Sequence, residues 1–160
     1  MVVGEKNTTI EEEFKAVFEV PYSVGELKAV ALKDDKEVEE IVLTTAGKAA
    51  QITLKPDRKT IKADGQDLVF ITVEITDDNG VLAPHAENRL QFNVSGPGEI
   101  IGVDNANLKD TDLYMANNRK VWHGRALVIV KSTRKAGVIK VEVSSEGLGK
   151  SDITINSGNN

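Results

Sequence analysis

The stretch that decides the fold is Asp67–Thr76, DLVFITVEIT, in which an aliphatic β-branched residue occupies every second position from Val69 to Ile75. This period of two is typical of a β-strand that packs one face and exposes the other. The same alternation recurs in Arg89–Ser95 (RLQFNVS), Ala126–Ser132 (ALVIVKS) and Gly137–Ser144 (GVIKVEVS). No segment keeps a helical period of 3.6 for long, so the sequence predicts an all-β protein.

Strands and turn signals follow one another at regular spacing after Ala46-Gly47-Lys48, which we expect to be a hinge. Seven or eight short strands over roughly 105 residues are typical of an immunoglobulin-like β-sandwich, which we place at residues 47–157. Asp77-Asp78-Asn79-Gly80 is expected to be a tight hairpin turn, because Asn-Gly supplies positive φ values. The expected strands are Ile52–Lys55, Thr60–Ala63, Leu68–Thr76, Leu90–Val94, Glu99–Val103, Ala126–Lys131, Val138–Val143 and Asp152–Ile155.

The alternation also predicts which side chains face the core, since a slip of one residue would turn a strand inside out. Aromatic residues make up only 4% of the chain, so aliphatic side chains must do most of the packing. The expected inward residues are Val69, Ile71, Val73, Ile75, Leu90, Phe92, Val94, Val128, Val130, Ile139, Val141 and Val143.

Residues 1–46 predict a smaller, incomplete sheet. We expect strands at Phe14–Val20, Leu27–Leu32 and Val38–Thr45, with a polar turn at Lys33–Lys36 between the last two. A region of this size rarely buries enough apolar surface to offset its ordering entropy. It should therefore lean on the second part, pair with another chain, or be the tail of a larger domain.

Composition excludes several classes of function. The 25 acidic and 20 basic residues are spread along the chain, whereas nucleic-acid binding needs a concentrated basic face. The absence of cysteine excludes disulfides, thiol catalysis and cysteine-ligated zinc. No stretch approaches the roughly 20 apolar residues of a membrane-spanning helix, and the N-terminus does not read as a secretory signal.

Most of the charged clusters look structural rather than catalytic. Glycosidase chemistry needs two carboxyls about 5–10 Å apart, one with a raised pKa, and the polar surroundings of Glu11–Glu13 and Glu39-Glu40 favour a solvated face instead. His85 and His123, the only histidines, lack the spacing of a zinc site. We predict no catalytic residue and no cofactor.

Two regions remain candidates for binding. Residues 102–112 crowd oxygen donors that could suit Ca²⁺, although such residues also stabilise turns; they are Asp104, Asn105, Asn107, Asp110 and Asp112. Trp122 could stack against a sugar ring or cap the end of the sandwich. The possible sugar contacts around it are Tyr114, His123 and Arg125. A protein partner would instead meet loops or an edge strand.

Two groups of strand and turn segments resemble the C-terminal region of bacterial family 2 glycoside hydrolases, the β-galactosidase group. The first resembles the end of an Ig-like domain that follows the catalytic barrel: Pro21-Tyr22, Gly25–Ala31, Asp34–Val38 and Thr44–Gly47. The second resembles the C-terminal domain of the same enzymes, itself similar to the Ig-like repeats of invasin-type adhesins: Leu54, Pro56–Ile61, Ala63–Gly65, Leu68, Ile71–Asp77, Phe92–Val94, Gly96–Gly98, Ile101–Asn105, Ser132-Thr133 and Ala136-Gly137.

This resemblance implies a biological context. Residues 1–46 would be the last strands of a preceding Ig-like domain. The whole chain would be a non-catalytic accessory module of a glycosidase, a β-galactosidase acting in carbohydrate breakdown. The catalytic glutamates would lie in a barrel outside this chain, so the chain itself should have no glycosidase activity. Its partners would be the catalytic domains of the same polypeptide, and the parent protein would be periplasmic or at the cell surface. A carbohydrate-binding module and an adhesin-like repeat are the alternatives, and a repeat array should show several copies.

Overall fold

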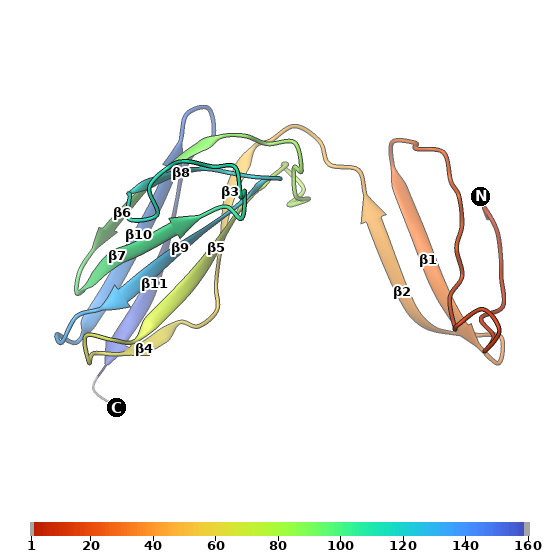
Figure 1. The fold of residues 1–160 in the computed structure, drawn as a ribbon, viewed down its shortest axis with the longest axis horizontal. Helices are drawn as coiled ribbons and strands as arrows, with labels where there is room; N and C mark the ends of the chain where they lie inside the picture. Colours follow the sequence, from red (N-terminus) through yellow and green to blue (C-terminus); the bar gives the residue numbers. More distant parts are fainter. Residues whose placement is uncertain (1, 159–160) are drawn as a thin grey trace. The chain divides into compact units, whose positions relative to one another are not determined.

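The computed structural model of the chain describes residues 2–158, which fall into two compact units with a boundary between Thr45 and Ala46 (Figure 1). Residues 2–158 contain strands and turns and no α-helix, which confirms the predicted all-β class. These residues contain no helix that could span a membrane.

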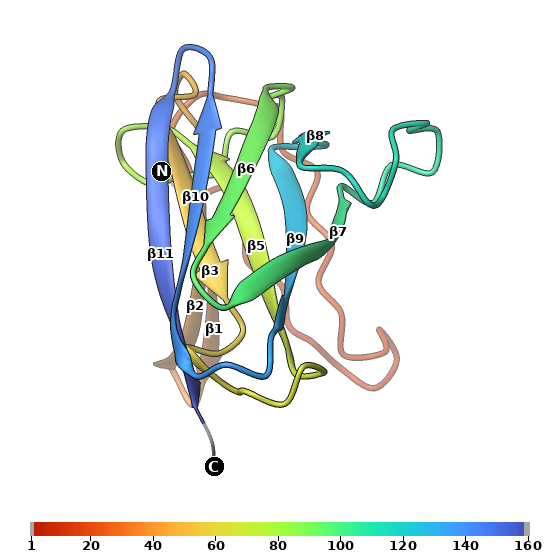
Figure 2. The ribbon, with the colours of Figure 1, turned by 90° about the vertical axis from the view of Figure 1, so that its left-hand side faces the viewer.

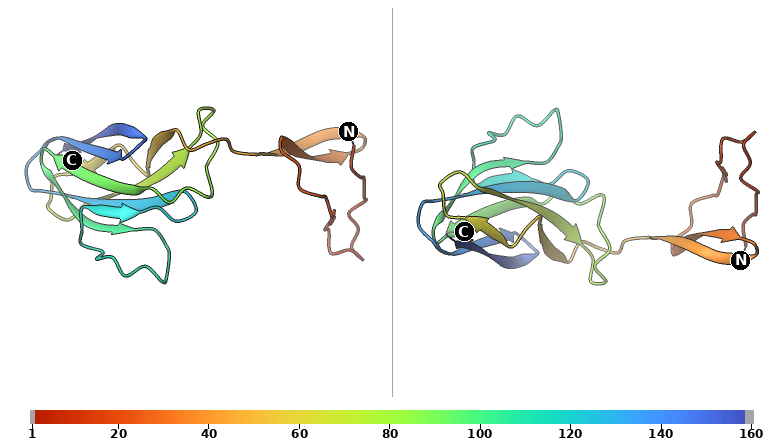
Figure 3. Two further views of the ribbon diagram at one scale, coloured as in Figure 1. Left: turned by 90° about the horizontal axis from the view of Figure 1, so that it is seen from above. Right: turned by 90° about the horizontal axis from the view of Figure 1, so that it is seen from below.

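The second unit is a sandwich of two sheets, seen edge-on in Figure 3. One sheet has the order β4-β11-β10-β6-β8 and the other the order β3-β5-β9-β7; all pairs are antiparallel except β4 with β11. The strands are β3 Gln51–Pro56, β4 Thr60–Lys62, β5 Leu68–Thr76, β6 Arg89–Ser95, β7 Gly98–Asp104, β8 Asn118–Lys120, β9 Arg125–Ser132, β10 Gly137–Ser145 and β11 Gly149–Gly158.

The core lies between the two sheets and consists almost entirely of Val and Ile. On β5, Val69, Ile71, Val73 and Ile75 are all 0% exposed, as their alternation predicts. Eleven of the twelve expected inward residues are buried, and Val94 is only partly buried against the core. Phe92 is the one aromatic side chain of this core among the described residues, so aliphatic packing stabilises the sandwich.

The turn at Asp77–Gly80 does not have the backbone conformation that the dipeptide Asn-Gly predicts. Gly80 has φ 80°, but Asn79 has no positive φ. The Asp77 carboxylate instead accepts hydrogen bonds from the backbone N–H groups of Gly47 (2.8 Å), Asn79 (2.9 Å) and Val81 (2.8 Å). These donors, Gly47 and Val81 above all, hold the pKa of Asp77 below its usual value.

A two-residue turn with two positive φ values lies elsewhere, between β8 and β9. His123 (φ 48°) and Gly124 (φ 74°) form it, and Trp122 and Arg125 exchange both backbone hydrogen bonds. A Cβ atom on Gly124 would stand 2.4 Å from the carbonyl oxygen of Ala83, so this position needs glycine for space as well as for conformation.

The first unit contains two strands, β1 Glu26–Lys33 and β2 Lys36–Thr44, paired as an antiparallel hairpin. The predicted turn between them is present, with positive φ at Asp34 and Asp35. The prediction of a strand at Phe14–Val20 is wrong: residues 10–14 form a turn and residues 15–20 are not part of a sheet. Alternation alone does not make a strand, because a strand also needs a partner for its backbone groups.

Every residue of β1 and β2 is exposed, including Leu27, Leu32, Val38, Ile41 and Leu43. An isolated two-stranded hairpin is only marginally stable in water. The hairpin thus has the aliphatic composition of a sheet that packs against a second layer, but no second layer covers it within this unit.

Candidate functional site

The loop of residues 105–117, between β7 and β8, extends away from the sandwich (Figures 2 and 3). It contains most of the oxygen donors that the sequence singles out, and it begins directly after Asp104, the last residue of β7. Both candidate sites, the oxygen-rich segment and the surroundings of Trp122, meet at this loop.

The oxygen donors are used within the loop. The Asp104 carboxylate accepts the N–H groups of Asn105 (2.7 Å) and Ala106 (3.3 Å). The side-chain oxygens of Asn105, Asn107 and Asp110 each accept the N–H group two residues further on, at 2.8–3.1 Å. These are Asx turns, and they order the loop from its own side chains.

No group of three or more His, Cys, Asp or Glu side chains converges within residues 2–158 in a way that could hold a metal ion. The Asp112 carboxylate does not accept an Asx-turn hydrogen bond and instead pairs with Arg89 at 2.8 Å. Calcium binding by these residues stays a prediction, because the Asx turns account for their arrangement without a metal ion.

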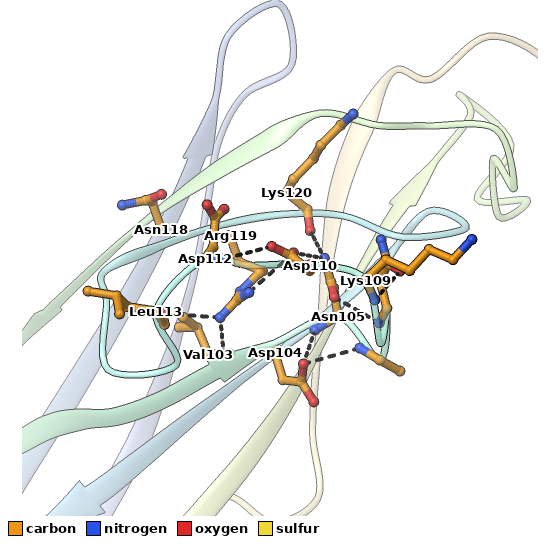
Figure 4. A network of polar contacts seen from close by, with 12 residues as sticks. Val103, Asp104, Asn105, Lys109, Asp110, Asp112, Leu113, Asn118, Arg119 and Lys120 are labelled. Atoms are coloured by element: carbon orange, nitrogen blue, oxygen red, sulfur yellow. Dashed lines mark hydrogen bonds and ion pairs between the residues drawn. The ribbon is translucent and has the colours of Figure 1, made fainter.

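A buried arginine fixes the base of the loop (Figure 4). Arg119 is 1% exposed, and its Nη2 donates to the carbonyl oxygens of Val103 (2.9 Å) and Leu113 (3.0 Å). Its Nη1 lies 3.2 Å from the Asp110 carboxylate. One guanidinium thus ties the end of β7, the middle of the loop and its returning limb together.

Asp110 completes the network. Its carboxylate also accepts a hydrogen bond from Asn105 Nδ2 at 2.6 Å, and Asn105 Nδ2 donates as well to the Lys120 carbonyl oxygen. The N–H of Asp112 is the largest cause that lowers the pKa of Asp110, and Arg119 and Asn105 add to it against the opposing effect of burial. Asp110 is therefore a charged anchor of the loop rather than a proton donor.

A polar groove of about 210 Å³ lies beside this network, with Trp122 on its wall. Trp122 is 40% exposed, and its ring meets His123 edge-on with 4.5 Å between centroids. The groove carries two exposed ion pairs, Arg89 with Asp112 and Lys120 with Glu87 at 2.6 Å. The residues that line it are Glu87, Arg89, Asn105, Asn107, Lys109, Asp110, Thr111, Asp112, Lys120, Val121 and Trp122.

The four side chains proposed around a sugar do not form one site. Tyr114 stacks over the Arg119 guanidinium, with 5.3 Å from Cζ to the ring centroid. Arg125 pairs with Glu74 at 3.0 Å, as does Lys55 at 2.6 Å. Burial raises the pKa of Glu74, but the hydrogen bonds and charges of Lys55 and Arg125 outweigh it and the net shift is downward. Of the four, only Trp122 lines the groove.

No sequence pattern predicts the anchoring role of Arg119 or the groove residues Glu87, Arg89 and Lys120. A buried arginine looks like any polar residue of a loop, since only its tertiary partners distinguish it. Arg119 and Lys120 belong to β8, a three-residue strand of polar composition that alternation does not detect.

The fold defines an immunoglobulin-like β-sandwich module. Residues 52–154 match the family described as "Glycoside hydrolase family 2 C-terminal domain 5", and the chain belongs to that family, as the resemblance predicts. Residues 2–39 match a family described as a domain of unknown function (DUF4982).

Similar proteins cover both units. The β-galactosidase BoGH2A of Bacteroides ovatus is 38% identical over 144 residues, which are 90% of this chain and 17% of that protein. A β-galactosidase of Thermoanaerobacter pseudethanolicus is 33% identical over 79% of the chain and 15% of its own length. The crystal structure of a glycosyl hydrolase family 2 member from Bacteroides cellulosilyticus superposes with a TM-score of 0.91 at 38% identity, over 97% of this chain and 20% of that one. The chain thus spans about a fifth or less of these proteins' length.

Proposed function

We propose that this chain is a non-catalytic accessory module of a longer family 2 glycoside hydrolase that cleaves β-galactosides in carbohydrate breakdown. The two β-galactosidases that cover most of the chain support this substrate class. The module would act through contact with the catalytic domains of the same polypeptide.

The observation that carries the non-catalytic role is the state of the carboxyl groups. A glycosidase acid needs a raised pKa. Every carboxyl whose pKa is clearly shifted among the described residues is shifted downward, by backbone N–H groups or by Lys and Arg partners: Asp64, Glu74, Asp77, Glu87 and Asp110. These carboxylates stabilise turns and ion pairs and are poor proton donors.

The test is hydrolysis of a chromogenic β-galactoside by the chain alone and by the long polypeptide that carries it. We expect background rates from the chain and turnover from the long polypeptide. Hydrolysis by the chain alone above the background rate would overturn the non-catalytic role. Turnover of a β-glucuronide in place of a β-galactoside would overturn the substrate class.

Residues 1–46 are proposed to be the last strands of a preceding Ig-like domain. The hairpin β1-β2 exposes aliphatic side chains along its whole length, and those side chains need a second layer. We further propose that the parent protein is periplasmic or at the cell surface. Fractionation of the producing cells tests this, and recovery of the protein in the cytoplasm would contradict it.

Sugar binding is a second candidate function, favoured by one observation, the groove with Trp122 on its wall. An exposed aromatic ring beside paired charges suits the apolar face and the hydroxyl groups of a pyranose. Because Trp122 is the only tryptophan, its fluorescence reports on the groove alone. Titration with galactose should change the emission if the groove binds sugar, and no change up to millimolar concentrations would dismiss the idea.

A further inference from the structure

Four large side chains of the 105–117 loop are exposed, and we call them the apolar loop patch. Leu108 is 100% exposed, Met115 82%, Leu113 76% and Tyr114 62%. In the second unit the other exposed large hydrophobic side chains are Phe70, Trp122 and Val138, and Trp122 lines the groove that this loop borders. Most exposed large apolar side chains of this unit therefore belong to one loop. Such grouping marks an interaction site, whereas single scattered residues need no explanation.

The loop that carries the patch is held in place. The Tyr114 carbonyl oxygen accepts the N–H of Val103 (2.8 Å), and the Asn117 carbonyl oxygen accepts the N–H of Phe92 (2.7 Å). Arg119 donates to the Leu113 carbonyl oxygen at 3.0 Å. The backbone of the returning limb is thus fixed to β6, β7 and β8, while the side chains of Leu113 and Tyr114 point away from the core.

Tyr114 itself is oriented by the buried guanidinium. Arg119 covers one side of the ring, with 5.3 Å from Cζ to the centroid, and this contact adds to the backbone anchors. Because folding already fixes this segment, a partner would not have to order it on binding. Preorganised apolar side chains lose less conformational entropy on association than mobile ones.

Charged side chains lie on the same loop and in the groove that it borders. Asp112 pairs with Arg89 within hydrogen-bond distance, Lys120 pairs with Glu87, and all four side chains are partly or largely exposed. Exposed apolar side chains that include Tyr and Met, next to charged side chains, have the composition of a protein–protein interface.

We infer that the apolar loop patch is the surface by which this module docks on the catalytic part of its own longer polypeptide. This inference rests on the proposed function. The occupant follows from length, since more than four-fifths of the similar β-galactosidases lies outside the matched region. A covalent link gives such a partner a high effective concentration, so the patch is occupied without the affinity that a second copy would need.

The interface has a natural probe in Met115, because the chain has only one other methionine, Met1. Thioether oxidation by dilute hydrogen peroxide follows exposure. We expect Met115 to be oxidised at least tenfold more slowly in the long polypeptide than in the chain alone, as read by peptide mass spectrometry. Equal rates in the two proteins would overturn the inference.

A matched control is the variant Val138→Met, which places a methionine at a position 56% exposed on β10, outside the loop. It should be oxidised at the same rate in both proteins. Equal protection of positions 115 and 138 would overturn the assignment to the loop. If Met115 is protected in the chain alone and this protection disappears on dilution, the occupant of the patch is a second copy of the chain and not the catalytic part.

A second pair of variants gives an independent readout. Leu113→Ser with Met115→Ser should leave the melting temperature of the chain unchanged but lower that of the long polypeptide, whereas Val138→Ser should change neither. An unchanged melting temperature of the long polypeptide would contradict the docking role. Protection of Met115 in a long polypeptide that hydrolyses no glycoside would instead refute the proposed function and leave the docking surface standing.

Discussion

Two regions of this chain have the same kind of strand composition and very different burial. In β5 the residues at alternate positions from Val69 to Ile75 are all 0% exposed, whereas in β2 Val38 and Ile41 are each 60% exposed. The difference lies in what covers them, because β5 faces a second sheet and β2 belongs to a lone hairpin. Alternation identifies a strand face, and only the partner layer converts that face into stability.

The largest expected effect is a truncation in the sandwich core. Ile71→Ala removes a fully buried side chain and should lower the free energy of unfolding of the second unit by about 3–4 kcal/mol. Trp122 fluorescence during urea unfolding measures it, since the lone tryptophan lies in this unit. The control Ile41→Ala in the hairpin should not move this transition; an equal shift would break the comparison.

The next effect concerns the buried charge at the base of the loop. Arg119→Met removes the buried cation beside Asp110 and the donor of two backbone carbonyls, and should cost about 3 kcal/mol. Arg89→Met removes an exposed partner of Asp112 and should cost less than about 1 kcal/mol. Comparable losses for both variants in urea unfolding would show that Arg119 is not the anchor that we describe.

Glycine substitutions separate space from conformation. Gly124→Ala meets both a positive φ and the Ala83 carbonyl oxygen, and should destabilise the second unit by about 2–3 kcal/mol. Gly80→Ala has a similar φ and open space around it, and should cost about 1 kcal/mol. Thermal melts of the two variants compare them directly, and a larger loss at Gly80 would contradict the close approach of Gly124 to Ala83.

Much of the sandwich follows from the sequence, and the loop does not. The bounds of β5 match the prediction residue for residue, because Leu68–Thr76 combines alternation with β-branched side chains and ends at a turn. Strand β8 is missed because Asn118–Lys120 has no apolar alternation. The sequence singles out Trp122 as a residue that either contacts a sugar or caps the sandwich, but its groove partners come from β6, β8 and the loop and can be placed only by the tertiary fold.

The same limit explains the errors. Phe14–Val20 alternates and yet forms no strand, since no partner strand lies beside it. The turn predicted at Asp77–Gly80 is present, since the Gly80 N–H donates to the Asp77 carbonyl oxygen at 3.0 Å. Only Gly80 has a positive φ, however, and the Asp77 carboxylate fixes the turn through three backbone N–H groups. Side chains that act through distant partners leave no local signature in the sequence.

The smallest predicted effect is on the pH dependence of stability. The pKa of Asp77 is lower in the folded state than its usual value of 3.8, so its stabilisation is complete above that value and is lost as the pH falls through the folded pKa. Asp77→Asn should therefore make the loss of stability between about pH 4 and pH 2 shallower. Urea unfolding at several pH values measures this slope, and an unchanged slope would mean that Asp77 carries no such stabilisation.

Amide hydrogen exchange tests most directly whether the sandwich is self-sufficient while the hairpin depends on further polypeptide. In the chain alone, amides of β5, β9 and β10 should exchange only through global unfolding, and those of β1 and β2 should exchange close to the rate of an open chain. In the long polypeptide, β1 and β2 should become protected as well. Protection of the hairpin equal to that of β5 in the chain alone would contradict the account.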